Sequence, residues 1–326
     1  MNKARQSAVL RILGTVIALV LLVYVLYEQG WAEIEAAVRQ IETWRIGLAL
    51  LVMLVSRLAV TGRWYVLLRS GGASITPAQS FQITFAGLFA NNFLPTTVGG
   101  DVIRLAGALR LKCDAAISAA SLIADRLVGM AGMLMAVPFG LPRLMQLQDL
   151  RELIPTTTPA IQMGLAGLTF SKSFGKLFTR IWEKGHGVFR RLISTLALWI
   201  KQPRALFQAL VFTWVNMLCL FTVLTLFFNG MGQHISFWLV AGLYSFVYLI
   251  TLMPISINGY GLQEISMTLV FTTLGGASLA SSLTAALLFR TTMMVASLPG
   301  VLFVPGLLAY SRQVPEVQNP PAVDRV

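Results

Sequence analysis

The sequence predicts an all-α polytopic membrane protein with about six full spans and two re-entrant broken hairpins arranged as an inverted repeat. Three observations support this fold class. The 326 residues are 56% hydrophobic and only 12% charged, with a mean hydropathy of +0.74. Several apolar segments approach the roughly 20 residues that a spanning helix needs. Two similar interruptions, at 95–100 and 254–261, lie at equivalent places in two related halves. Soluble domains are about a quarter charged, so this composition excludes an ordinary soluble fold.

The charge balance predicts how the chain is oriented in the membrane. There are 25 Lys and Arg against 13 Asp and Glu, a formal net charge of +12. No stripe of basic residues lies on a polar domain, so nucleic acid is not an expected partner. In a membrane protein, such an excess collects in cytoplasmic loops and faces anionic lipid. We therefore expect a multi-pass protein of the bacterial cytoplasmic (inner) membrane with both termini in the cytoplasm.

Residues 1–45 are expected to form an N-terminal anchor span and an outer interfacial helix. The apolar segment 8–27 follows basic residues and precedes the acidic stretch 28–45. This order places the N-terminus inside. Apolar side chains recur in the acidic stretch at helical spacing, which is typical of a helix lying at the membrane interface.

Residues 46–137 form the first half of the predicted repeat. Spans are expected at 46–68 and 115–137, with an apolar segment at 77–94 between them. The chain then breaks at 95–100, where Pro95 and two glycines oppose a continuous helix. Basic residues on both sides of the segment predict a re-entrant hairpin. Broken backbone persists at membrane depth only where it is buried in protein or lines a wet cavity.

The connector, residues 138–204, contains a weak span at 159–170 and a basic amphipathic segment at 172–204. That segment carries eight Lys or Arg and one Glu. We expect it to lie as a helix on the anionic cytoplasmic surface, with a plain positive-inside anchor as the alternative.

Residues 205–311 form the second half, with apolar segments at 206–228 and 237–253, a break at 254–261, and a long final segment at 279–310. Pro299-Gly300 either kinks or divides that final segment. Residues 312–326 form a polar cytoplasmic tail. An odd number of crossings separates the two breaks, so the halves are inverted relative to each other. In transporters built this way, the interrupted segments meet near the midplane and form the binding site.

Ionisable residues within the apolar segments are the candidate site. Each charge costs at least about 2.5 kcal/mol in the bilayer, so it faces a cavity or a partner. Asp125 and Arg126 are adjacent and point about 100° apart on a helix, so they cannot pair with each other. Symmetry predicts that Arg126 and Arg290 converge, with Asp101 and Glu264 as counter-charges. The remaining charged candidates are Arg63 and Arg104, whereas Arg57, in the same segment as Arg63, is not counted among them.

Two interpretations of these charges stay open. They form either a cationic cavity for a phosphate-bearing headgroup or structural ion pairs that tie the helices together, with Arg57 and Arg63 snorkelling inward. Polar residues at the breaks either hydrogen-bond the headgroup or satisfy freed backbone groups; these are Asn92, Thr97, Ser256 and Asn258.

The sequence contains no signal for catalysis. The two histidines, His186 and His234, have no metal-ligand spacing around them, and neither a nucleotide-binding loop nor a nucleophile elbow is present. We therefore expect no catalytic residue, no metal and no cofactor.

Several motifs resemble the lysylphosphatidylglycerol synthase transmembrane family. They run from Asn92-Phe93-Leu94-Pro95 through Gly99-Gly100-Asp101-x-x-Arg104 and Asp125-Arg126, then from Pro254 through Gly261-x-x-Glu264 to Arg290. The similarity covers roughly residues 46–310.

The family includes the flippase half of the bacterial multiple peptide resistance factor. The resemblance implies a role in moving lipids, with Arg126, Arg290, Glu264 and Asp101 at the motif positions. The sequence shows no soluble aminoacyl-transferase half, so lysine transfer to phosphatidylglycerol is not implied. Asn258-Gly259-Tyr260-Gly261 stands where relatives commonly have paired glycines.

We therefore expect a lipid flippase or transporter that binds a phosphate-bearing headgroup between the two hairpins. A second hypothesis is a non-transporting membrane partner that presents lipid to a separate synthase or glycosyltransferase. A third, a membrane-embedded transferase, is disfavoured because no metal or nucleotide motif accompanies the charged residues.

Overall fold

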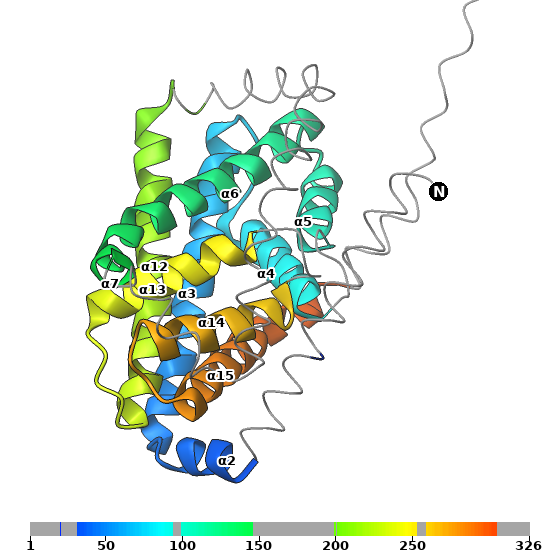
Figure 1. Cartoon of the computed structure of the whole chain (residues 1–326). Coiled ribbons are helices and arrows are strands. Elements are labelled where there is room, and N and C mark those ends of the chain that lie inside the picture. Colours follow the sequence, from blue (N-terminus) through cyan, green and yellow to red (C-terminus); the bar gives the residue numbers. More distant parts are fainter. Residues whose placement is uncertain are drawn as a thin grey trace, which may run out of the picture.

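The computed structural model of the chain describes residues 20, 31–93, 99–145, 199, 201–252 and 259–304. Every regular element in these ranges is a helix (Figure 1). In chain order they are α2 (Trp31–Arg39), α3 (Thr43–Ser70), α4 (Pro77–Phe93), α5 (Gly99–Arg110), α6 (Ala115–Ala136), η1 (Val137–Phe139), α7 (Leu141–Met145), α12 (Pro203–Gly230), α13 (Phe237–Thr251), α14 (Leu262–Thr273), α15 (Leu279–Ser297) and η5 (Leu298–Leu302).

Short polar side chains begin three of these helices. Asp114, Ser236 and Ser278 each accept a hydrogen bond from a backbone N–H in the first turn of α6, α13 and α15. Such caps satisfy donors that have no partner within the helix. Glu42 precedes α3 in the same way, but its carboxylate accepts instead from the side chains of Arg45 and Trp44. These two hydrogen bonds, that from Arg45 above all, lower the pKa of Glu42 below its ordinary value.

The order and the lengths of the helices repeat. α3 and α12 are both 28 residues long. α5 and α14 are both 12 residues long. α3 and α4 begin at Thr43 and Pro77, and α12 and α13 begin at Pro203 and Phe237, so the two pairs of helices are equally spaced along the chain. α6 and α15 each end in a 3₁₀ turn, η1 and η5. Two groups of five elements therefore correspond one to one.

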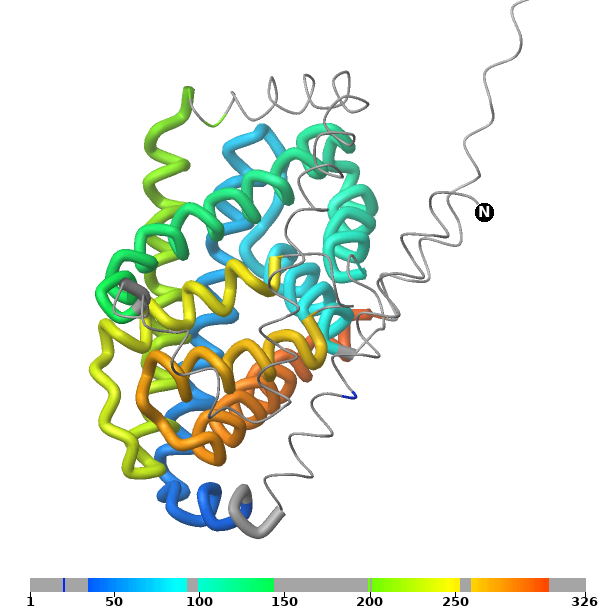
Figure 2. Tube along the Cα trace, in the orientation of Figure 1, coloured from blue at the N-terminus to red at the C-terminus, as the bar shows by residue number. Residues whose placement is uncertain are grey.

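The corresponding helices α3 and α12 pack against each other and run in opposite directions (Figures 1 and 2). Contacts between the halves are reciprocal: α4 lies against η5 and α13 lies against η1, while α6 contacts α12 and α15 contacts α3. Each half therefore completes the packing of the other, and neither forms a separate bundle.

Two of these reciprocal contacts bring backbone against backbone. A Cβ atom added at Gly242 of α13 would lie 2.1 Å from the backbone nitrogen of Gly140, just after η1. One added at Gly300 of η5 would lie 2.0 Å from the carbonyl oxygen of Phe85 on α4. Only glycine permits such approach, because backbone atoms cannot rotate aside as a side chain does.

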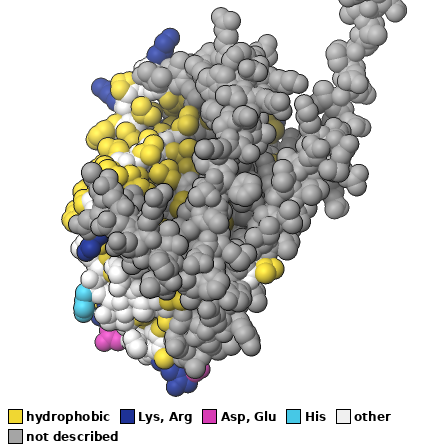
Figure 3. All heavy atoms as spheres, viewed as in Figure 1, with side chains coloured by type: hydrophobic (Ala, Val, Ile, Leu, Met, Phe, Trp, Pro, Cys, Tyr) yellow, Lys and Arg dark blue, Asp and Glu magenta, His cyan; other side chains and the backbone are white. Residues whose placement is uncertain are grey.

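The distribution of apolar side chains fits a bilayer. The main core packs α3, α12, α13, α14 and α15 together around Phe227, Phe228, Phe271 and Phe289, all fully buried. Other large apolar side chains are exposed on the outer faces of α3, α6 and α12, including Leu51, Leu58, Leu134, Phe207 and Trp214. Figure 3 shows such side chains gathered over α6 and α12.

Four described helical segments are long and apolar enough to cross a membrane: Thr43–Ser70, Ala115–Phe139, Pro203–Gly230 and Leu279–Leu302. They coincide with four of the six spans predicted from the sequence. The other two, at 8–27 and 159–170, lie outside the described residues, as do most of the basic segment 172–204 and the tail. The two breaks, at 95–100 and 254–261, lie largely outside them too. The re-entrant hairpins therefore remain a prediction.

The final segment, predicted at 279–310 with a kink or a division at Pro299-Gly300, continues from α-helix into a 3₁₀ turn at this point. The α-helix ends at Ser297, and Pro299 lies in the 3₁₀ turn that follows. Proline has no N–H to continue the helical hydrogen bonds, which accounts for the change at this position.

We predict that Gly242→Ala destabilises the protein by about 1–3 kcal/mol, because the added methyl group forces α13 away from η1. The measurement is the thermal unfolding midpoint of the detergent-solubilised protein. The control is Gly47→Ala on α3, where an added Cβ meets nothing within 4 Å. Equal midpoints for Gly242→Ala and Gly47→Ala would contradict the close packing of α13 on η1.

Candidate functional site

Asp125 is the centre of a buried charge cluster in the first half. Its Oδ1 atom accepts a hydrogen bond of 2.6 Å from Arg63 Nε, and its Oδ2 atom accepts from both terminal nitrogens of Arg104 at 3.1 Å. Arg63 lies on α3, Arg104 on α5 and Asp125 on α6, so one carboxylate joins three helices. Asp125 is 2% exposed, and the two arginines are also buried.

Arg126, the next residue along α6, has a different partner. Its Nε atom donates to Asp101 Oδ2 at 2.7 Å, and Asp101 also lies 3.5 Å from Arg104. Adjacent residues on a helix point in different directions, which explains why Asp125 and Arg126 bind separate partners. The Arg126 side chain is 52% exposed, whereas those of Arg63 and Arg104 are about a tenth exposed.

Aromatic and hydroxyl groups hold this first-half cluster in place. The Arg104 guanidinium lies 4.6 Å from the centre of the Trp64 ring, and the Trp64 indole donates to Ser121 at 3.1 Å. Arg63 also donates to Thr213 of α12 at 3.3 Å. With Arg63, Arg104 and Arg126 against Asp101 and Asp125, the cluster has one more positive than negative charge.

The second half has a simpler charge pair. Arg290 Nε on α15 donates to Glu264 Oε1 on α14 at 2.5 Å, and both side chains are buried. Arg290 also donates to the carbonyl oxygen of Gly259 at 3.3 Å and lies 4.8 Å from the centre of the Tyr260 ring. The second carboxylate oxygen of Glu264 is buried and has no hydrogen-bond partner in the part of the chain that the structure describes.

Arg126 and Arg290, which symmetry predicts to converge, take part in two separate ion pairs. Arg126 pairs with Asp101 and Arg290 pairs with Glu264, each within its own half. No ion pair among the described residues joins these two pairs. Instead, Tyr248 of α13 lies within electrostatic range of Arg63, Asp125 and Arg126, one turn from Tyr244.

Asn92 joins the halves through structural hydrogen bonds. Its amide nitrogen donates to Ser297 Oγ at 2.9 Å, and its backbone carbonyl accepts from the Tyr260 hydroxyl. The Asn92 side chain therefore joins α4 to α15, and neither the headgroup nor the freed-backbone interpretation of Asn92 is tested by this contact. The other three candidates of this kind, Thr97, Ser256 and Asn258, lie outside the described residues.

Neither Arg57 nor Arg63 snorkels to the surface, since each is 8% exposed. Arg63 is paired with Asp125 and fits the ion-pair interpretation. Arg57, at the middle of α3, has no carboxylate within ion-pair distance in the described part of the chain.

Sequence reasoning did not identify Trp64, Tyr244, Tyr248 or Tyr260 around the charges. Each lies in an apolar stretch where an aromatic residue is indistinguishable from core packing. Of these four residues, only Tyr260 has a signal in the sequence. It stands between Gly259 and Gly261 inside the second break, where the repeat predicts the site.

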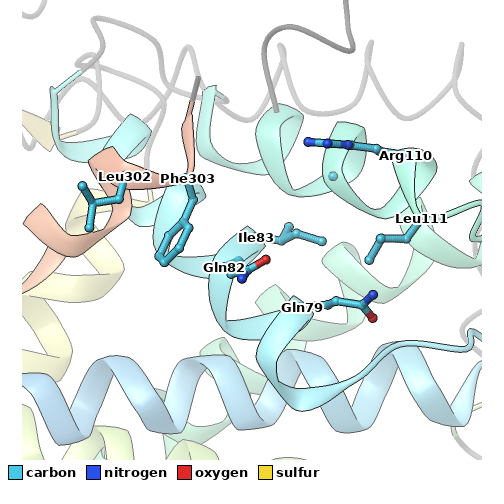
Figure 4. A pocket seen from close by; sticks show the side chains of 8 residues that line it. Gln79, Gln82, Ile83, Arg110, Leu111, Leu302 and Phe303 are labelled. Carbon is cyan, nitrogen blue, oxygen red and sulfur yellow. The ribbon is translucent and has the colours of Figure 1, made fainter. Parts of the chain in front are cut away.

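A mixed polar and apolar groove of about 330 Å³ lies away from these charges (Figure 4). Its walls come from α4, from the end of α5 and from the chain at η5. Gln79, Gln82 and Arg110 provide its polar groups, and Ile83, Leu111, Leu302 and Phe303 provide its apolar wall. The described residues contain no group of three His, Cys, Asp or Glu that could hold a metal ion.

A comparison with protein families matches residues 11–300 to the lysylphosphatidylglycerol synthase TM region. The chain belongs to this family. The match covers both halves of the fold and every charged candidate above. No curated protein matches the chain. Family membership and the apolar helices together make this a multi-pass membrane protein related to lipid handling.

We predict that Asp125→Asn destabilises this member of the family by about 3–5 kcal/mol, because two buried arginines lose their shared carboxylate. The thermal unfolding midpoint should fall accordingly. Glu35→Gln breaks an exposed pair with Arg39 and should leave the midpoint nearly unchanged. An Asp125→Asn protein as stable as the wild type would show that Asp125 does not hold α3, α5 and α6 together.

Proposed function

We propose that this protein is a lipid flippase or transporter that binds a phosphate-bearing headgroup between its two halves. It acts without catalysing a reaction and without a cofactor. It lies in the bacterial inner membrane with both termini in the cytoplasm. The observation that carries the proposal is the first-half cluster, where three arginines face two aspartates and Arg126 is half exposed.

The chemistry of Arg126 suits a phosphate. A guanidinium presents a planar fork of donors that matches phosphate oxygens. A partly exposed ion pair contributes little stability, so a phosphate competes with Asp101 for Arg126 at small cost. The Arg63–Asp125–Arg104 group, being buried, keeps the helices in place during this exchange. Asp101, once released, would balance the charge or bind an ammonium group of the headgroup.

The repeat supports movement of the headgroup across the membrane. In transporters with inverted repeats, one half rocks against the other around a central site. The antiparallel α3 and α12 provide such a pair of related elements, and they pack against each other. The second half contributes Glu264 on α14 and Arg290 on α15. These helices correspond to α5, which carries Asp101, and to α6, which carries Arg126.

The groove in Figure 4, away from Arg126, offers the two kinds of surface that a lipid needs. Two glutamines and an arginine lie beside apolar side chains in its lining, which includes Leu302 and Phe303. A lipid headgroup with its first chain segments has this same division into polar and apolar parts.

A second candidate is a membrane partner that presents lipid to a separate lipid-modifying enzyme. The family description favours it, because it names the membrane region of a synthase. The basic segment 172–204 would hold either kind of protein on the anionic membrane surface, at about 1 kcal/mol per basic residue.

We predict that purified protein in vesicles moves fluorescent phosphatidylglycerol between leaflets, and that Arg126→Ala with Arg290→Ala slows this at least tenfold. The loss follows from removing a phosphate-binding guanidinium from each half. The measurement is the fraction of lipid fluorescence that dithionite quenches from outside. The control is Arg143→Ala, which alters an exposed arginine on α7.

Unchanged lipid movement in a correctly folded double variant would refute the assignment of Arg126 and Arg290. Lipid binding by the wild type without any movement between leaflets would favour the second candidate.

A further inference from the structure

Arg57 differs from the other intramembrane arginines in its partners. Arg63, Arg104, Arg126 and Arg290 each form an ion pair with an aspartate or a glutamate. In the described part of the chain Arg57 has none. Its Nη2 atom donates to the sulfur of Met53 at 3.1 Å, and its buried Nε atom has no hydrogen-bond partner among the described residues.

The position of Arg57 makes this lack of a counter-charge significant. It lies midway between Thr43 and Ser70, the two ends of α3, so its backbone sits near the centre of a candidate span. Its side chain is 8% exposed and therefore does not reach water at either membrane surface. Arginine at the centre of a span is unfavourable unless it faces a partner or a cavity. A transiently bound anion would supply the negative charge that the described neighbouring side chains do not provide.

The surroundings of Arg57 connect it to both charge groups. Tyr244 of α13 lies within electrostatic range of Arg57 and of Arg290. One turn further along α13, Tyr248 lies within range of Arg63, Asp125 and Arg126. Beside Arg57, Ser56 donates to Asn216 of α12 at 2.7 Å, where the two long antiparallel helices pack. Tyr244 thus lies near both Arg57 and Arg290, and Arg63 of the first-half cluster lies on the same helix as Arg57.

We infer that Arg57 binds the phosphate of a phospholipid headgroup at the middle of its path through the protein, with Tyr244 as the neighbouring hydroxyl. The inference rests on the proposed function and adds a residue to it. Arg126 and Arg290 must release a carboxylate before they bind phosphate, whereas Arg57 has none to release among the described residues. Its bidentate fork fits a phosphodiester, and the bound anion neutralises the buried charge.

The test uses the full chain in detergent and titrates dioctanoyl phosphatidylglycerol, with the thermal unfolding midpoint as the measurement. We expect the lipid to raise the midpoint of the wild type. Arg57→Met should weaken lipid binding at least tenfold without lowering the midpoint of the lipid-free protein, because the substitution removes an unpaired buried charge and keeps the volume. Arg57→Lys should bind more tightly than Arg57→Met but more weakly than wild type. The matched control, Arg69→Met, changes an exposed arginine on the same helix and should bind as wild type.

Two further ligands test whether Arg57 recognises the phosphate of a lipid or free inorganic phosphate. Dioctanoylglycerol, which has the chains without the phosphate, should not raise the wild-type midpoint. An equal response to it would overturn phosphate recognition. Inorganic phosphate that reproduces the whole effect of the lipid, and loses it in Arg57→Met, would overturn the lipid as the source.

The inference and the proposed function fail in different ways. A wild-type protein with no response to phosphatidylglycerol would refute the proposed function. A wild-type response that Arg57→Met retains in full would overturn the role of Arg57 alone. If Arg57→Met does not yield folded protein, equal binding by Arg57→Lys and wild type overturns the inference, since a lysine lacks the fork.

Discussion

The arrangement of the first half depends on one buried carboxylate, that of Asp125. Three helices, α3, α5 and α6, each contribute a charged side chain to it, and none of these charges is stable alone at this depth. Once Asp125 is shared by Arg63 and Arg104, the orientation of α6 is set, and Arg126 is directed towards Asp101 on a more open side. The partly exposed pair proposed to meet a headgroup is therefore a consequence of the buried one.

The two halves are alike in helices but not in charge. The second half places Arg290 and Glu264 on the helices that correspond to those of Arg126 and Asp101, yet its pair is buried and nearly neutral. None of its described residues matches the shared carboxylate of Asp125, because Phe289 occupies the position before Arg290 and is fully buried in the core. The two halves therefore have similar backbones but different distributions of charge. On the proposed function, a headgroup would meet a cationic group in the first half and a neutral ion pair in the second.

Much of this fold could be predicted from the sequence, because a bilayer requires long apolar helices and the chain shows them directly. The segments expected at 46–68, 115–137 and 206–228 correspond to α3, α6 and α12, and the internal repeat matches the equal spacing of the helices in the two halves. The pairing of charges was less accessible. That Asp125 and Arg126 need separate partners follows from helix geometry, but which arginine reaches which aspartate depends on how α5 packs on α6. The environment of Arg57 leaves no mark in the sequence, because its burial and its lack of an acidic partner among the described residues depend on tertiary packing.

The antiparallel packing of α3 and α12 has an electrical consequence. Both helices are 28 residues long, and each carries a macrodipole equal to about half a charge at either end. Two such dipoles side by side and pointing the same way repel, whereas opposed ones attract and cancel at a distance. The two longest described helices therefore add almost no field of their own along the axis they share. The electrostatic potential beside these two helices therefore comes mainly from charged side chains. A single substitution of a charged residue on α3 or α12 changes that potential directly.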